Sequence, residues 1–133
     1  MNNFEEIKLE LIKMRELAYS PYYKFTVGTV LVAKSGKTYT GCNIENITQG
    51  PGMCGERVAF GKALSEGEKE FDCIYIMGGP TEQTGVNITP CGVCRQFLAE
   101  FCKPDFKIIN VYGDDFIQKE YILKDIFPEG YNM

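Results

Sequence analysis

Residues 89–122, TPCGVCRQFLAEFCKPDFKIINVYGDDFIQKEYI, contain the pattern that decides the fold. A helical segment is followed by two strand-like runs, Lys107–Tyr112 and Ile117–Ile122, joined by the turn Gly113-Asp114-Asp115. Parallel neighbours need a crossover of roughly a dozen residues or more, and this turn is far shorter. The two strands are therefore antiparallel if they pair, and the helix before them predicts a layered α/β fold.

The rest of the chain continues the alternation of helices and strands. Thr89 as N-cap and Pro90 as first helical residue predict a helix to about Phe101. Asn3 and Glu6 form the pattern of a capping box. The other elements that the sequence predicts are a helix from about Asn3 to Tyr19, strands at Val27–Ala33 and Lys37–Asn43, a helix at Cys54–Leu64, a buried strand at Cys73–Met77 and a polar loop from Gly78 to Ile88.

Composition limits the classes of function. The 133 residues, 44% of them apolar, predict one domain over residues 1–133. The formal charge is -4 and the basic residues are scattered, which argues against a nucleic-acid partner, because phosphate contacts need a basic footprint. The N-terminus resembles neither a signal nor a transit peptide, and no apolar run reaches the roughly 18 residues that span a bilayer. We expect no membrane partner and a cytoplasmic location.

Two short motifs indicate a metal centre. Cys54-Gly55-Glu56 precedes Pro90-Cys91-Gly92-Val93-Cys94, and the chain has no histidine. A catalytic zinc typically takes three protein ligands and leaves its fourth position to water. A ligand followed by a nearby glutamate and a later P-C-x-x-C is typical of zinc-dependent nucleobase deaminases, and an all-cysteine ligand set is one of their variants. Cys54, Cys91 and Cys94 are therefore the predicted ligands of one zinc ion per subunit.

The chemistry of deamination assigns roles to the neighbouring charges. A bound zinc ion lowers the pKa of water to about 7, and a carboxyl group must then collect and return protons. Glu56 is the predicted proton carrier. Three thiolates give the zinc site a net negative charge, so positive surroundings are expected. Helix N-termini supply part of it, and Arg57 and Arg95, beside the ligands, are expected to donate hydrogen bonds to them.

The six cysteines are also compatible with other interpretations of the chain. Six cysteines in a small chain are compatible with a disulfide framework, but no export signal supports an oxidising compartment. A single C-x-x-C is also compatible with a redox or a structural site. A structural zinc module would need a fourth ligand from Cys42, Cys73 or Cys102, whose apolar neighbours favour buried packing instead.

Four motifs together resemble the small, homotetrameric cytidine deaminases. They are Tyr19-Ser20-Pro21-Tyr22-Tyr23-Lys24-Phe25, Asn43-Ile44-Glu45-Asn46, Cys54-Gly55-Glu56-Arg57 and Pro90-Cys91-Gly92-Val93-Cys94-Arg95-Gln96. The resemblance implies a three-layer α/β/α sandwich with a five-stranded mixed sheet, the last two strands antiparallel. It also implies a cytoplasmic hydrolase of pyrimidine salvage that converts cytidine and deoxycytidine to uridine and deoxyuridine and releases ammonia.

The same resemblance implies a set of substrate contacts. Asn43 and Glu45 should bind the sugar hydroxyls, and Phe25 should stack on the base. The backbone of Gly55 and of the Thr89-Pro90 segment should meet the amide edge of the pyrimidine. A C-terminal aromatic should reach the site of a neighbouring subunit, and Tyr131 or, second, Phe127 matches it.

Three departures from the family pattern lie near the predicted site. Gly55 stands where alanine is usual, Gln49 stands where an aromatic is common, and the loop Gly50-Pro51-Gly52 is unusual. These positions leave open a related deaminase of a cytosine-containing antibiotic such as blasticidin S. Asn43 and Glu45 favour a ribose instead. Deamination within RNA or DNA conflicts with the acidic charge and with the predicted antiparallel strand pair.

Overall fold

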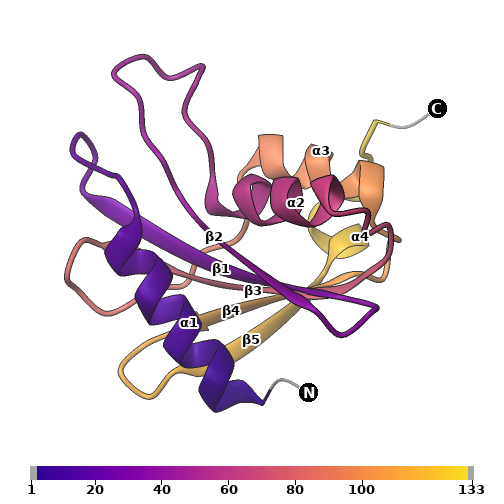
Figure 1. The fold of residues 1–133 in the computed structure, drawn as a ribbon, viewed down its shortest axis with the longest axis horizontal. Helices are drawn as coiled ribbons and strands as arrows, with labels where there is room; N and C mark the ends of the chain where they lie inside the picture. The colour runs from indigo at the N-terminus through magenta and orange to yellow at the C-terminus, as the bar shows by residue number, and fades with distance from the viewer. Residues whose placement is uncertain (1–2, 132–133) are drawn as a thin grey trace.

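A computed structural model describes residues 3–131 as one five-stranded sheet with helices on both faces (Figure 1). The strand order is β2-β1-β3-β4-β5. The elements are α1 (Phe4–Leu17), β1 (Phe25–Ala33), β2 (Thr38–Cys42), α2 (Gly55–Ser65), β3 (Phe71–Pro80), α3 (Gly92–Phe101), β4 (Lys107–Tyr112), β5 (Ile117–Ile122) and α4 (Leu123–Ile126).

The sheet is mixed, as expected. β3 and β4 are parallel, because the segment containing α3 crosses over between them, and the other neighbouring strands are antiparallel. β4 and β5 pair from Lys107↔Ile122 to Tyr112↔Ile117. The turn between them contains Gly113 at φ 81°, a left-handed conformation that glycine adopts without steric cost. The predicted antiparallel pairing of the last two strands is confirmed.

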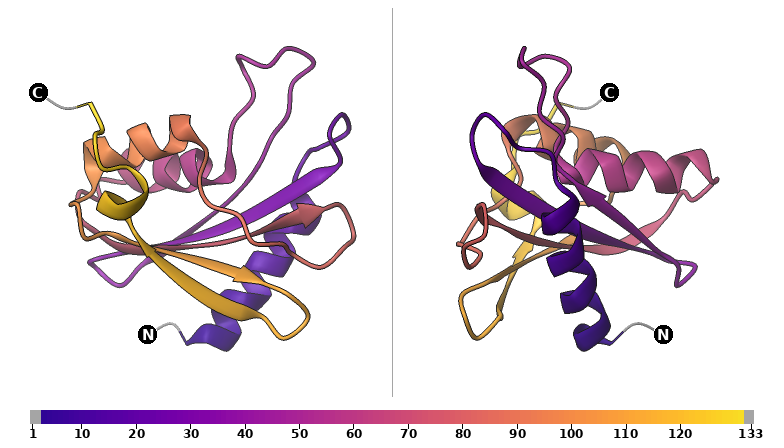
Figure 2. Two further views of the ribbon diagram at one scale, coloured as in Figure 1. Left: turned by 180° about the vertical axis from the view of Figure 1, so that it is seen from behind. Right: turned by 60° about the vertical axis from the view of Figure 1, so that its left-hand side comes forward.

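The helices form two outer layers. α1 covers one face of the sheet, and α2 and α3 cover the other, with the short α4 beside α3 (Figures 1 and 2). Ile7, Leu11 and Met14 are the buried residues of α1, and the predicted Asn3–Glu6 capping box begins this helix. On the opposite face of the sheet, Phe60 of α2 and Leu98 of α3 are fully buried. The predicted three-layer α/β/α architecture is confirmed.

Two predicted boundaries are wrong. β3 does not end at Met77 but continues through Gly78-Gly79 to Pro80, because the two glycines pair with β1. α3 begins at Gly92 with Cys91 as its N-cap, not at Thr89 and Pro90. The Thr89 hydroxyl accepts a hydrogen bond from Arg95 instead of capping the helix. Local sequence signals for a turn and for a cap were both overridden by tertiary contacts.

Gly41 sets the height of α2 above the sheet. A Cβ atom at Gly41 would lie 2.2 Å from the Gly55 carbonyl oxygen and 2.8 Å from the Ala59 amide nitrogen. These are backbone atoms, so the helix itself would have to move. We expect Gly41→Ala to destabilise the protein by about 3 kcal/mol, at the upper end of overpacking effects.

Urea unfolding measures this loss, and Gly61→Ala is the matched control. Gly61 lies on the exposed side of α2, where a Cβ atom would meet nothing within 4 Å. That substitution should leave the protein as stable or make it more stable by up to about 1 kcal/mol, because alanine is the better helix former. Equal stability of Gly41→Ala and wild type would show that α2 does not rest on Gly41.

Candidate functional site

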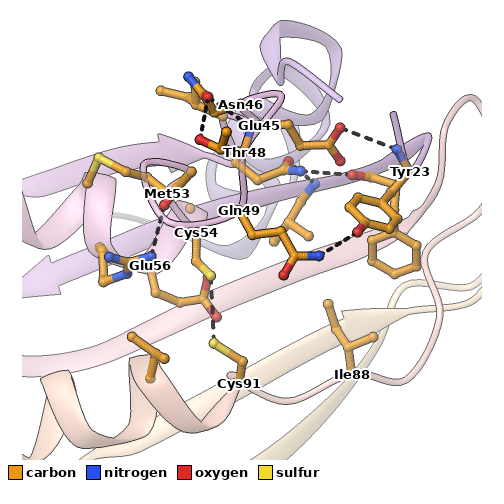
Figure 3. Close-up of a pocket in the computed structure, with 18 of the residues that line it drawn as sticks. Tyr23, Glu45, Asn46, Thr48, Gln49, Met53, Cys54, Glu56, Ile88 and Cys91 are labelled. Carbon is orange, nitrogen blue, oxygen red and sulfur yellow. Dashed lines mark hydrogen bonds between the residues drawn. The ribbon is translucent and has the colours of Figure 1, made fainter. Parts of the chain in front are cut away.

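Three thiols meet where the N-termini of α2 and α3 approach each other. Cys54 is the N-cap of α2, Cys91 is the N-cap of α3, and Cys94 lies in the first turn of α3. Their sulfur atoms all lie within 4.8 Å of one another. Figure 3 shows the Cys54 and Cys91 side chains turned toward each other, with their sulfurs 3.7 Å apart. The structure therefore brings together the three predicted ligands from two separate motifs.

The thiol cluster fits a zinc ion. Zinc–sulfur bonds of about 2.3 Å in a tetrahedral site place two sulfurs about 3.8 Å apart, close to the Cys54–Cys91 distance. A hydrogen bond from Cys94 lowers the pKa of Cys54 to about 5, and Cys91 and Arg57 add to the effect. The same hydrogen bond, together with burial, raises the pKa of Cys94. Among residues 3–131 the cluster has three members, so the zinc site is open at one position.

Glu56 lies beside the thiols in the first turn of α2. Because Cys54 is the N-cap and stands outside the helix, both side chains can face the same space although they are two residues apart. Glu56 is 6% exposed. Burial raises its pKa to about 7, and the neighbouring Cys54 contributes in the same direction. A carboxyl group with a pKa near neutrality can both accept and donate a proton at physiological pH.

The two arginines that flank the ligands behave differently. Arg57 lies close enough to Cys54 to lower the pKa of its thiol, and its guanidinium group donates to the Gly52 carbonyl oxygen at 3.3 Å. Arg95, which was expected to contact the thiols, donates instead to the Pro90 carbonyl oxygen at 2.7 Å and the Thr89 hydroxyl at 2.7 Å. A third bond of Arg95 reaches the Ile126 carbonyl oxygen at 2.6 Å. The Arg57 guanidinium group therefore lies beside the thiols, whereas Arg95 binds segments of the chain next to the thiols and does not contact the thiols themselves.

A cavity of about 530 Å³ opens over Cys54, Cys91 and Glu56. Its walls include Phe25, Asn43, Glu45 and Gly55, four of the residues that were predicted to contact substrate. The lining also includes Ile88 and Thr89, so both motif-bearing halves of the chain contribute. A pyrimidine nucleoside is within the size range that cavities of this volume bind.

Asn43 and Glu45 also shape the wall that they belong to. The Asn43 side chain accepts from the Val27 amide at 2.8 Å and donates to the Phe25 carbonyl oxygen at 2.8 Å. Glu45 accepts hydrogen bonds from the Ser20 hydroxyl and the backbone amides of Tyr22 and Tyr23. Desolvation opposes these bonds, but together they hold the pKa of Glu45 below its ordinary value. Glu45 is therefore an ionised acceptor at neutral pH.

Thr29 is a residue of the site that sequence reasoning missed. It is fully buried on β1 and donates a hydrogen bond to the Gly55 carbonyl oxygen at 2.9 Å. A Cβ atom at Gly55 would lie 3.1 Å from the Thr29 methyl group. The alanine that the family pattern has at this position would therefore require a small shift of Thr29. A hydroxyl residue within the apolar run Val27–Ala33 was the signal that could have found it.

The rim of the cavity is built by two loops that are distant in sequence. The Gln49 side-chain amide donates to the Tyr23 hydroxyl at 2.8 Å, and Figure 3 shows this bond next to the cavity. Gln49 therefore replaces the aromatic that the family pattern places there with a polar contact between the loops.

The two C-terminal aromatics lie in different surroundings. Tyr131 is 73% exposed, and its backbone pairs with the Gln96 side chain through two hydrogen bonds. Phe127 packs against the buried cluster around Phe60 and Leu98 of its own chain. Of the two predicted contacts with a neighbouring subunit, the structure leaves the Tyr131 side chain at the surface and places Phe127 against the core.

The arrangement of thiols, carboxyl group and cavity on this layered α/β fold is that of a zinc-dependent nucleobase deaminase. Residues 1–109 match the family model for the cytidine and deoxycytidylate deaminase zinc-binding region. The chain belongs to this family, and it is a hydrolase that acts on cyclic amidines.

Known proteins agree in sequence and in fold. The chain is 42% identical over 112 residues to a cytidine deaminase of Sporosarcina psychrophila, covering 83% of this chain and 79% of that protein. A crystal structure of cytidine deaminase from Burkholderia pseudomallei superposes with a TM-score of 0.81 at 36% identity, over 98% of this chain and 100% of that one. A blasticidin-S deaminase of Bacillus cereus is 27% identical over 118 residues, 84% of each chain.

Proposed function

We propose that this protein hydrolyses cytidine and deoxycytidine to uridine and deoxyuridine, one water being consumed and one ammonia released per turnover. The observation that carries this proposal is the buried carboxyl group of Glu56 beside three clustered thiols at the base of a nucleoside-sized cavity. The 42% identity to a cytidine deaminase supports the choice of substrate.

Cys54, Cys91 and Cys94 would hold the zinc ion, which supplies hydroxide at neutral pH by lowering the pKa of water. Glu56 accepts one proton from the attacking water and passes it to the ring nitrogen. It then accepts the second proton, from the hydroxyl group now on the attacked carbon, and passes it to the leaving amine, which departs as ammonia. Arg57 offsets part of the negative charge of the thiolates through its guanidinium charge beside Cys54. The helix N-termini at Cys54 and Cys91 act in the same direction.

The cavity wall orients the nucleoside. Phe25 stacks on the base, and the backbone of Gly55 and Thr89-Pro90 meets its amide edge. A carboxylate has about four acceptor positions, and the three protein donors to Glu45 leave room for a sugar hydroxyl. Asn43, with its amide already fixed between Phe25 and Val27, presents a polar group of defined orientation to the same sugar.

The test is ammonia release by the zinc-loaded protein from four substrates in parallel: cytidine, deoxycytidine, blasticidin S and a cytosine-containing oligonucleotide. Turnover of the two nucleosides is expected. Turnover of blasticidin S, with no turnover of cytidine or deoxycytidine, would contradict this proposal. It would favour a deaminase of the antibiotic, the activity for which the 27% identical relative is named. Inactivity toward all four in protein that carries one zinc per chain would overturn the deaminase assignment of the site.

Glu45→Gln tests sugar recognition. We expect KM for cytidine and deoxycytidine to rise about tenfold or more with a smaller change in kcat, because a charged acceptor for a sugar hydroxyl is lost. Steady-state kinetics of both nucleosides measure the change. Ser20→Ala is the control, because it removes one donor to Glu45 while leaving the carboxylate in place. An unchanged KM in Glu45→Gln would exclude Glu45 from sugar binding.

We also propose that the protein is a homotetramer that serves pyrimidine salvage in the cytoplasm, and that Tyr131 enters the site of a neighbouring subunit. Large apolar side chains are exposed near the cavity, including Tyr23, Ile44 and Ile47, and an assembly would cover them. Gln96 holds the backbone of Tyr131 at α3 while the side chain stays at the surface. Light scattering of the purified protein measures the assembly.

No helix within residues 3–131 is long and apolar enough to cross a membrane.

A further inference from the structure

Asn110 is a fully buried polar residue in the middle of β4. Its side-chain oxygen accepts from the Ile88 amide at 2.9 Å, and its side-chain nitrogen donates to the Ile76 carbonyl oxygen at 3.1 Å. Ile76 belongs to β3, whereas Ile88 belongs to the segment that leads to Cys91. The one side chain therefore connects the sheet to the wall of the cavity.

The position of Asn110 explains why a side chain is needed there. β3 and β4 pair in parallel from Cys73↔Lys107 to Ile76↔Asn110. Beyond this point β3 continues beside β1, and the segment from Gly85 comes between the two strands, where Val86 donates to Gly78 at 2.7 Å. In parallel sheets ligands bind beyond the carboxyl ends of strands that separate in this way. Asn110 completes the hydrogen bonds of the backbone at the point of separation.

Arg95 holds the residues that follow Ile88. Its guanidinium group donates to the Thr89 hydroxyl and to the Pro90 carbonyl oxygen, both at 2.7 Å. Its third bond, to the Ile126 carbonyl oxygen, anchors the guanidinium group from the opposite side. Three consecutive residues before the ligand Cys91 are thus fixed by two side chains from different elements.

We infer that Asn110 and Arg95 are positioning residues of the proposed deaminase, and that they hold the segment Ile88–Cys91 in the geometry that the reaction needs. The inference rests on the proposed function. Ile88, Thr89 and Cys91 all line the cavity above Glu56, so a displacement of this segment moves one wall of the substrate site. Misplacement of a substrate by about 1 Å costs on the order of 100-fold in rate.

A purely structural role for Asn110 makes a different prediction. Loss of a buried polar contact would then lower the stability of the whole fold without loosening one segment. Hydrogen–deuterium exchange separates the two roles, because the Ile88 amide is itself the donor to Asn110. Its exchange rate reports on the contact whether or not the protein deaminates cytidine.

The experiment compares wild type, Asn110→Leu and Val111→Ala in zinc-loaded protein. Leucine has the same branching and the same number of side-chain heavy atoms as asparagine, and it has no hydrogen-bonding groups. Val111 is the next residue of β4, fully buried in the opposite cluster with α1, so its truncation is the matched control for lost stability. The three readouts are exchange of the Ile88 amide, zinc per chain and steady-state kinetics with cytidine.

For Asn110→Leu we expect exchange of the Ile88 amide to be at least tenfold faster and kcat/KM to fall about 10–100-fold at unchanged zinc content. Val111→Ala should leave kcat/KM and zinc content unchanged, and it should not speed exchange of the Ile88 amide more than that of other buried amides of the fold. Asn110→Asp keeps the acceptor for Ile88 and should keep slow exchange at that amide. If Asn110→Leu does not fold, Arg95→Met takes its place, and faster exchange across residues 88–91 with the same loss of kcat/KM is expected.

Wild-type exchange or wild-type kcat/KM in the folded Asn110→Leu variant would overturn the inference. The same holds for Arg95→Met where it is the variant measured. If wild type releases no ammonia from cytidine but the variants show faster exchange, the proposed function is wrong. The inference that Asn110 and Arg95 hold the segment Ile88–Cys91 would then still stand.

Discussion

Glu56→Gln is expected to retain zinc and the fold and to lose turnover. Glutamine has nearly the same size as glutamate and cannot exchange protons near neutral pH. General acid–base catalysis contributes about 10²–10⁴-fold to rates, so kcat for cytidine should fall by that factor or more. Steady-state kinetics, zinc per chain and thermal unfolding of the same preparation separate the loss of chemistry from the loss of structure.

The stability of the metal-free variant gives an independent check on the burial of Glu56. Burial raises the pKa of this carboxyl group to about 7 from its ordinary value of 4.5. Between these two values the folded chain retains a proton that the unfolded chain has released. Glu56 therefore contributes a loss of stability as pH rises through this window, and this contribution is absent from Glu56→Gln. Metal-free Glu56→Gln should therefore gain stability relative to metal-free wild type as pH rises from 4.5 to about 7.

The matched control is Glu100→Gln, which neutralises an exposed carboxylate on α3. This variant should behave as wild type in turnover and in the pH dependence of stability. Substantial activity of Glu56→Gln, above about a tenth of the wild-type kcat, would remove the proton-carrying role from Glu56 and require a different group for it.

The parts of the fold that local chemistry defines could be read from the sequence. The β4 and β5 boundaries follow from strand-like segments on both sides of the turn Gly113-Asp114-Asp115, and the start of α1 follows from the capping pair at Asn3 and Glu6. The end of β3 could not be read in this way. Gly78-Gly79-Pro80 has a turn composition, but its pairing with Phe25–Val27 keeps it in the sheet. That pairing depends on a strand about 50 residues away.

The same distinction between local and long-range chemistry applies to the candidate site. Ligand identity follows from residue type and spacing, and Cys54, Cys91 and Cys94 do meet in space. The contacts that hold the site are long-range and have no motif. Arg95 has a ligand as its neighbour in sequence, yet its side chain binds Thr89, Pro90 and Ile126. Asn110 lies in an apolar strand far from both motifs. An isolated polar residue in such a strand was its only signal.

Cys94→Ala is expected to abolish zinc binding and turnover together. Cys94 is fully buried and contributes one of three sulfurs, and a site with two thiolates loses a large part of its affinity. We expect zinc per chain to fall from about one to near zero after dialysis, with kcat below about 10⁻³ of wild type. Elemental analysis and the ammonia assay on the same sample measure both.

Chelation and a second cysteine decide whether this loss comes from the metal. Because zinc binds the folded state, a chelator should lower the unfolding temperature of wild type and leave that of Cys94→Ala unchanged. Cys102→Ala is the matched control, since Cys102 ends the same helix outside the thiol cluster and burial raises its pKa to about 12. This control should keep one zinc per chain and wild-type sensitivity to the chelator. Full zinc retention by Cys94→Ala would mean that the ion is held elsewhere, and the open three-sulfur site, from which the hydrolytic mechanism follows, would be wrong.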